Sequence, residues 1–148
     1  MSNSQAEIAF IEHYPFTVEH ATLWGDMDAL NHVNNVQYYR YFEHLRTVFF
    51  YQLIGAIQTP DFSPVVAESS CRFLSSITYP DNLILGLGIE HIGSSQVIHQ
   101  YAIFSKAQQR IAATGVARMV NTDSAQGGKK PLLEEYKTLF ETFRLSSE

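Results

Sequence analysis

Residues 24–35, WGDMDALNHVNN, concentrate two aspartates, one histidine and three asparagines between two segments of different periodicity. Upstream, residues 16–23 alternate between two faces, a pattern that predicts a β-strand. Downstream, residues 35–55, NVQYYRYFEHLRTVFFYQLIG, repeat apolar side chains every three or four positions, as one face of an α-helix does. The fold is therefore decided by a strand, a polar loop and a long helix in direct succession.

The predicted helix has signals for its ends and for its surroundings. Asn34 or Asn35 suits the N-cap, and Gly55 suits a left-handed stop. The main apolar stripe consists of Tyr38, Phe42, Leu45, Phe49 and Leu53. Aromatic residues also lie on other faces of the helix: Tyr39, Tyr41, Phe50 and Tyr51. A helix that is apolar on several sides is buried on several sides, so we expect other elements to wrap around it.

Strand-like segments dominate the rest of the chain. They are PVVAESSCRFLSSI (64–77), NLILGLGIEHIG (82–93), QVIHQYAIFSK (96–106) and RIAATGVARMV (110–120). Their short links favour an antiparallel meander, because parallel strands need crossovers of about a dozen residues. A flexible exit, NTDSAQGGKK (121–130), precedes a last amphipathic helix that is expected to start at Pro131.

These elements predict an α+β fold with a curved antiparallel sheet wrapped around one long central helix, followed by a short C-terminal helix. Residues 1–14 lack a sustained period and are expected to form a flexible lead-in. Residues 15–148 are expected to form a single domain, since a chain of 148 residues matches the usual size of one.

Composition narrows the class of function. The formal net charge is −5 and the ten Lys and Arg residues are scattered, which disfavours binding to nucleic acid. Cys71 is the single cysteine, so an internal disulfide is excluded and a reducing compartment, the cytoplasm, is expected. No stretch approaches the ~18 consecutive apolar residues of a membrane span, so no membrane partner is expected.

Two kinds of chemistry fit the polar loop poorly. Asp26, Asp28 and His32 are possible metal ligands, but no second histidine follows at a metal-binding spacing, so no metal is expected. A nucleophilic serine elbow is missing, and Cys71 lies in a predicted strand, where a buried or half-buried structural role suits it.

A carboxylate beside a helix N-terminus fits better. The first turn of a helix exposes unpaired N–H groups that polarise a carbonyl oxygen, and a nearby carboxylate attacks the carbonyl or activates water. An Asx-rich turn with a helix cap explains the same residues without any catalysis. A cap needs one side chain, however, and this loop supplies several, so the excess calls for a function, and both explanations stay open at this point.

At these residues the sequence resembles the hotdog-fold acyl-CoA thioesterases, in particular the family that is similar to 4-hydroxybenzoyl-CoA thioesterase. Members show W/Y-x-D-x-D-x-x-G-H-V-N-N and then a helix that carries F-E-x-x-R. The matching residues here are Trp24, Asp26, Asp28, the run from His32 to Asn35, Phe42, Glu43 and Arg46. The resemblance extends over most of residues 15–121.

The resemblance implies roles for the loop. Asp28 matches the family's nucleophile or general base, and the N–H of Asn35, with Asn34 next, matches the group that polarises the thioester carbonyl. His32 and Asn34 match structural or water-orienting positions. Asn31 replaces the family's glycine, and asparagine tolerates positive φ better than other non-glycine residues, although its side chain enters the site and bears on substrate preference.

The resemblance also implies a substrate and an assembly. Acyl-CoA is the expected substrate, with no cofactor, and a homodimer or homotetramer is the expected assembly. Arg72 and Phe73 match the family's arginine-phenylalanine pair, while Ser94 and Ser95 are candidates for the wall of the substrate tunnel. The cations considered for contacts with the CoA phosphates are Arg72, Lys106, Arg110 and Arg118.

Two other acids and one other function stay open. Glu68 is a rival catalytic acid because some hotdog enzymes take a glutamate from another element. Glu43 is a further rival, but its spacing to Arg46 predicts an ion pair within the helix. A protein that binds acyl-CoA without catalysis, or a scaffold, is the alternative function.

Overall fold

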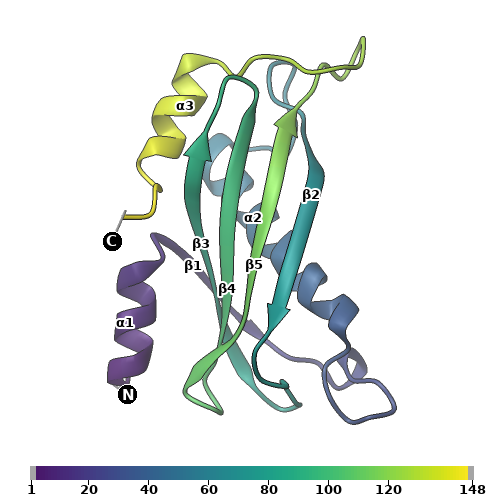
Figure 1. The fold of residues 1–148 in the computed structure, drawn as a ribbon, viewed down its shortest axis with the longest axis vertical. Helices are drawn as coiled ribbons and strands as arrows, with labels where there is room; N and C mark the ends of the chain where they lie inside the picture. Colours follow the sequence, from purple (N-terminus) through teal and green to yellow (C-terminus); the bar gives the residue numbers. More distant parts are fainter. Residues whose placement is uncertain (1–2, 147–148) are drawn as a thin grey trace.

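The computed structural model describes residues 3–146, and Figure 1 shows a strongly bent sheet with helices around it. The elements in chain order are α1 (Gln5–His13), β1 (Phe16–Ala21), the short 3₁₀ helix η1 (Trp24–Asp26), α2 (Asn35–Ile54), β2 (Pro64–Phe73), β3 (Asn82–Ile92), β4 (Gln96–Ser105), β5 (Arg110–Asn121) and α3 (Glu134–Glu141). The five strands form one antiparallel sheet, in agreement with the predicted α+β fold.

The order of strands differs from a simple meander. The sheet order is β1-β3-β4-β5-β2, so β3, β4 and β5 are consecutive neighbours, as predicted. The prediction that β2 lies next to β3 is wrong. β1 already occupies that edge of β3, with Phe16 opposite Leu87, and β2 pairs instead with the free edge of β5.

Helix α2 forms the centre of the core. Its N-cap is Asn34 and its C-cap is Gly55 with φ 85°, which confirms both predicted ends. The stripe from Tyr38 to Phe49 is buried, and the ring of Phe42 stacks on Tyr101 of β4 with 4.9 Å between centroids. A Cβ atom at Gly115 would lie 2.5 Å from the Phe42 ring, so this glycine lets the helix approach the sheet closely.

The expectation of a flexible lead-in is wrong for residues 5–13, which form α1. Ser4 caps the helix by accepting the N–H of Glu7 at 3.2 Å. Phe10 then packs with Ile84 and Phe104 in a second, smaller core on the face of the sheet that α2 does not cover. Burial of this apolar surface stabilises α1. The weak periodicity of residues 5–13 gave no sign of this helix in the sequence.

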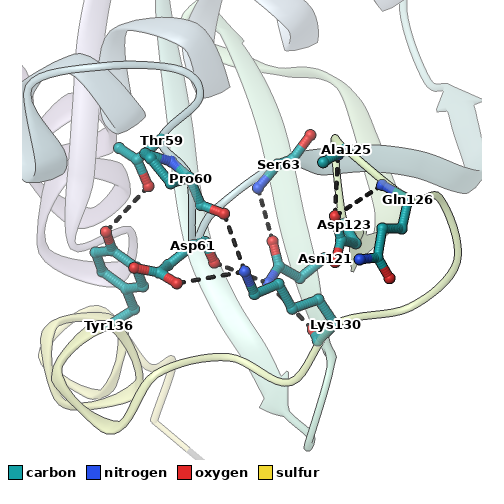
Figure 2. A network of polar contacts seen from close by, with 10 residues as sticks. All are labelled: Thr59, Pro60, Asp61, Ser63, Asn121, Asp123, Ala125, Gln126, Lys130 and Tyr136. Carbon is teal, nitrogen blue, oxygen red and sulfur yellow. Dashed lines mark hydrogen bonds and ion pairs between the residues drawn. The ribbon is translucent and has the colours of Figure 1, made fainter.

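At the end of the sheet away from residues 24–35, a buried asparagine connects several segments by hydrogen bonds (Figure 2). Asn121 is 2% exposed, and its amide donates to the carbonyl oxygens of Asp61 and Lys130, both at 3.1 Å. Its Oδ1 accepts the N–H of Ser63 at 2.7 Å. Helix α3 begins at Glu134, three residues later than expected, and Tyr136 joins this end through Thr59 at 3.2 Å. No helix in residues 3–146 is long and apolar enough to cross a membrane.

Candidate active site at the start of helix α2

The polar loop closes on itself through its backbone. The N–H of Asp28 donates to the carbonyl of His32, and the N–H of Asn31 donates to the carbonyl of Asp28, both at 3.0 Å. This tight turn requires a left-handed residue, which is Asn31 with φ 61°, as its sequence position indicated. The N–H of Val33 donates to the carbonyl of Ile77 at 2.8 Å and fixes the end of the loop to the body of the protein.

The carboxylate of Asp28 is held beside the first turn of α2. Its Oδ1 accepts the N–H of Leu30 at 2.9 Å. Its Oδ2 receives the side-chain amide of Asn34 at 3.4 Å, the long end of the hydrogen-bond range. Because Asn34 is the N-cap of α2, this contact places a half-buried carboxylate next to the positive end of the helix dipole.

The first turn of α2 retains a free donor at its first residue. Asn34 Oδ1 accepts the N–H of Val36 at 2.9 Å, and the carbonyl of Asn34 accepts the N–H of Gln37 at 2.9 Å. The N–H of Asn35 has no acceptor within the described part of the chain. A free N–H beside a carboxylate is the arrangement that polarises a carbonyl oxygen while an acid acts on its carbon.

Asp26 joins the loop to the helix. Its Oδ2 accepts the N–H of Leu23 at 3.0 Å and the hydroxyl of Tyr41 at 2.8 Å. Burial, together with the negative charge of Asp26, raises the pKa of Tyr41 above its ordinary value, so the hydroxyl stays a donor. The sequence offered no signal for this contact, because Tyr41 is one of several aromatic residues on the helix.

A groove begins at the same helix turn and runs along α2. Its volume is about 310 Å³, and it lies between the helix and the edge strand β2, with Tyr101 among its lining residues. The residues that line it are Val36, Tyr39, Arg40, Phe42, Glu43, Arg46, Val66, Ser69 and Tyr101. The groove is apolar at Val36, the residue after Asn35, and carries charged side chains further along the helix.

A family profile covers both the loop and the helix. The profile of the Thioesterase-like superfamily matches residues 22–140, which is most of the chain and includes the loop and all of α2. The chain belongs to this superfamily. Family membership confirms the expected hotdog fold and the expected class of enzyme, a thioester hydrolase.

Solved structures share the fold of this thioesterase. The PA5185 protein from Pseudomonas aeruginosa strain PAO1 is 25% identical with a TM-score of 0.84, covering 93% of this chain and 96% of its own. A thioesterase complexed with coenzyme A and Zn from Thermus thermophilus is 24% identical with a TM-score of 0.78, covering 89% and 96%. A 1,4-dihydroxy-2-naphthoyl-CoA thioesterase from Synechocystis is 19% identical with a TM-score of 0.74, covering 84% and 94%. Among curated proteins, no sequence matched.

Only some of the predicted binding residues of the thioesterase lie near the loop. Phe73 does, because its ring packs edge-on against Tyr38 in the first turns of α2, with 4.9 Å between centroids. Arg72 is the neighbouring residue on β2, so its side chain projects from the opposite face of the sheet. His32 is exposed and contributes to the turn only through its backbone carbonyl.

The structure does not bring Ser94 and Ser95 to the loop. β1 ends at Ala21 opposite Asn82, so the loop lies at the Asn82 end of β3, whereas the two serines follow Ile92 at its other end. Within one protomer the two serines therefore lie away from the loop, and their place in the wall of the substrate tunnel stays a prediction. Their carbonyl oxygens instead accept the N–H groups of Leu132 and Asn121.

Two of the four cations considered for contacts with the CoA phosphates form ion pairs with glutamates. Lys106 pairs with Glu19, and Arg118 pairs with Glu68 at 3.5 Å. Arg72 and Arg110 are exposed and form no ion pair with any residue in the range 3–146. No group of three or more metal-binding side chains is found among the residues that the structure describes.

The rival acids and the cysteine lie outside the polar loop. Glu68 is an exposed residue of the edge strand, and Glu43 pairs with Arg40 at 3.0 Å. The predicted pair between Glu43 and Arg46 is therefore wrong, because Glu43 takes the partner one turn earlier. Burial raises the pKa of Cys71 to about 11, so at neutral pH it is the unreactive thiol that its strand position predicted.

Proposed function

We propose that this thioesterase hydrolyses acyl-CoA thioesters with Asp28 as its catalytic acid residue and the N–H of Asn35 as the donor to the thioester carbonyl. One observation carries the proposal: Asn34 directs the Asp28 carboxylate to the helix turn where the Asn35 N–H is free. The neighbour from Thermus thermophilus that holds coenzyme A, and the naphthoyl-CoA thioesterase from Synechocystis, support CoA as the carrier.

Two alternative mechanisms fit this proposal. In the first, Asp28 takes a proton from water, and the resulting hydroxide attacks the thioester carbon while Asn35 N–H stabilises the oxyanion. Collapse expels the CoA thiolate, which takes up the proton. In the second route, Asp28 attacks the thioester carbon directly and expels the CoA thiolate, which forms a mixed anhydride. Water then hydrolyses the anhydride and supplies the proton that the thiolate takes up. Both routes yield the free acid and CoA and require no cofactor.

The groove along α2 suits an acyl group of short to medium length or an aromatic one. It starts at Val36, directly after the proposed carbonyl site, and its first wall is formed by Tyr39, Phe42 and Val66. Apolar walls bind an acyl or aryl group by removing its surface from water. We propose that Asn31, the left-handed residue of the same loop, affects which group is accepted.

A homodimer through the edge strand β2 is part of the proposal. Nearly all of β2 is exposed, and Val65, Val66 and Phe73 present apolar side chains along it. A long edge with unpaired backbone groups and apolar side chains is a template for pairing with a second strand. Pairing with a second copy would close the open side of the groove, and further association of two dimers gives the tetramer.

The free thiol of Cys71 is consistent with a cytoplasmic protein.

Hydrolysis of a panel of acyl-CoA and aroyl-CoA substrates tests the function. Asp28→Asn and Asp28→Ala are expected to lower kcat by at least ~100-fold, the usual cost of losing a catalytic acid or base. Glu68→Gln removes an exposed rival carboxylate and serves as the matched control, with kcat unchanged. Full kcat in both Asp28 variants would refute its role, and tight binding of acyl-CoA without turnover by wild type would favour the non-catalytic alternative.

A single turnover in H₂¹⁸O with enzyme in excess over thioester tests for the direct route. Water that opens the anhydride at the Asp28 carbonyl leaves ¹⁸O in the Asp28 carboxyl group, so label there establishes direct attack. Label found only in the released acid excludes an anhydride that water opens at Asp28. Mass spectrometry of the peptide that contains Asp28 gives the answer.

A further inference from the structure

We propose that Tyr41 is a positioning residue for the thioester hydrolysis: its hydroxyl holds Asp26, and through Asp26 it fixes the catalytic loop against the start of α2. This inference rests on the proposed role of Asp28. Tyr41 touches neither the substrate groove nor the Asp28 carboxylate, so its effect on the reaction would pass entirely through the geometry of the loop.

The contact is buried and specific. Tyr41 is 2% exposed, and its hydroxyl lies 2.8 Å from Asp26 Oδ2. A phenol that donates to an ionised carboxylate forms a charge-assisted hydrogen bond, which is stronger than one between neutral groups. The rings of His20 and Tyr38 lie at 5.3 and 6.3 Å from the Tyr41 ring, so its orientation is fixed by packing on two sides.

Asp26 connects the hydrogen bond of Tyr41 to the proposed catalytic residues. The oxygen that accepts from Tyr41 also accepts the N–H of Leu23, where the chain leaves β1. The carbonyl of Asp26 accepts the N–H of Asn34 at 2.9 Å, and Asn34 is the residue that contacts Asp28 and caps the helix. Displacement of Asp26 therefore moves the cap and the catalytic acid together.

Tyr41 is well placed for this task because it belongs to the body of the helix. It follows Asn35 by six residues, about 9 Å along the axis, where the helix is fully hydrogen-bonded. Within residues 3–146, this is the one side-chain hydrogen bond that connects the interior of α2 to residues 24–34. A purely apolar contact at this position would need only phenylalanine. It would leave Asp26 Oδ2 with the N–H of Leu23 but without the donor from the helix.

The test compares Tyr41→Phe with Tyr136→Phe. Each variant removes one hydroxyl from a side-chain hydrogen bond, but Tyr136 bonds Thr59 at the far end of the sheet. For Tyr41→Phe we expect kcat to fall roughly 10- to 100-fold, because small displacements of reacting groups have effects of this size. KM should change less than about three-fold, and the kcat of Tyr136→Phe should stay at the wild-type value.

A double-mutant cycle separates positioning from general structure. In single-turnover assays, adding Tyr41→Phe to Asp28→Asn should lower the residual rate by less than about two-fold, since the loop no longer holds a catalytic carboxylate. Asp26→Asn supplies a second variant if Tyr41→Phe does not fold. It keeps an oxygen acceptor without the charge and should also lower kcat with little change in KM, and the Asp26→Asn/Tyr41→Phe double variant should lose no more than the worse single variant.

The outcomes are distinguishable. Wild-type kcat in Tyr41→Phe overturns the positioning role, as does an equal loss of rate in the presence and absence of the Asp28 carboxylate. A loss confined to KM also overturns it. If Asp28→Asn retains full activity, the proposed function fails instead, whatever the result at Tyr41.

Discussion

The side-chain amide of Asn34 lies 3.4 Å from Asp28 Oδ2, while the oxygen of the same amide caps α2 at the N–H of Val36. One residue therefore links the proposed catalytic acid to the start of the helix that is proposed to polarise the substrate. The two halves of its amide have separable tasks, because the nitrogen serves the acid and the oxygen serves the helix.

Substitution of Asn34 should separate stability from activity. Asn34→Asp keeps an oxygen for the cap but removes the donor to Asp28, so we expect near wild-type stability and a large fall in kcat. Asn34→Ala removes both and should also lose about 1 kcal/mol of unfolding free energy. Urea denaturation and acyl-CoA hydrolysis measure the two effects. Equal activity in Asn34→Asp and wild type would show that the donor is dispensable.

Asn31 should tolerate glycine and resist β-branched residues. Its φ of 61° lies in the left-handed region, where a residue with a Cβ other than Asn or Asp is disfavoured by roughly 1–2 kcal/mol. Asn31→Gly is therefore expected to keep wild-type stability, and Asn31→Val to lose stability of that order in urea denaturation. A stable Asn31→Val variant would mean that the turn has another conformation. The same pair of variants, assayed on the substrate panel, shows whether the side chain selects the acyl group.

Helix α1 should contribute to stability through Phe10. This side chain is 4% exposed and packs against Phe104, with 5.4 Å between ring centroids. Phe10→Ala is expected to cost about 3–5 kcal/mol of unfolding free energy, the range for a large buried aromatic residue. Ile8→Ala, on the same helix but 44% exposed, is the control and should cost well under half of that. Similar small losses for both variants would contradict the packing of α1 on the sheet.

Because of His99, the unfolding free energy should be lower in acid than at neutral pH. It is 1% exposed with Nδ1 2.9 Å from the Tyr101 hydroxyl, and burial, with a smaller effect of Arg46, lowers its pKa to about 3. The unfolded chain protonates this histidine near pH 6.5, whereas the native protein does not until about pH 3. Between these values the unfolded state binds more protons, so the unfolding free energy falls as pH falls, by up to ~1.4 kcal/mol per pH unit.

The variant His99→Gln isolates this contribution. Glutamine does not titrate and retains a polar group for Tyr101, so its unfolding free energy should fall less steeply between pH 6.5 and 3 than that of wild type. His91→Gln replaces an exposed histidine of the neighbouring strand β3 and should preserve the wild-type slope. Parallel slopes for wild type and His99→Gln would show that His99 is not the source of acid sensitivity.

A charge on the edge strand should disrupt the proposed dimer. Val66 is 41% exposed on β2, and a lysine there places charges that oppose edge-to-edge pairing. Light scattering coupled to size exclusion is expected to give the mass of a single chain for Val66→Lys. Val116→Lys, on β5 with 39% exposure, is the control and should keep the wild-type mass. The reverse result would place the contact between protomers on the face of the sheet that carries Val116.

The local chemistry of the chain could be predicted from its sequence. The strand before the loop, the cap at Asn34, the stop at Gly55 and the left-handed turn at Asn31 were all predictable, because each depends on residues a few positions apart. The long apolar helix and the alternating strands likewise indicated a sheet around a helix. Asp28 was a candidate because the loop resembles the motif of the family, and its partners Leu30 and Asn34 lie within six residues of it.

Contacts between distant segments were decided only by the tertiary structure. β2 pairs with β5 rather than β3 because β1 takes the other edge of β3, and no local pattern records that competition. Periodicity did not reveal α1 either, since that helix depends on a surface of β3 and β4 formed far along the chain. The hydrogen bond from Tyr41 to Asp26 exists because the folded backbone brings two residues fifteen positions apart within 2.8 Å. Sequence patterns reveal the preferences of short segments, whereas burial and pairing across the sheet choose which segments meet.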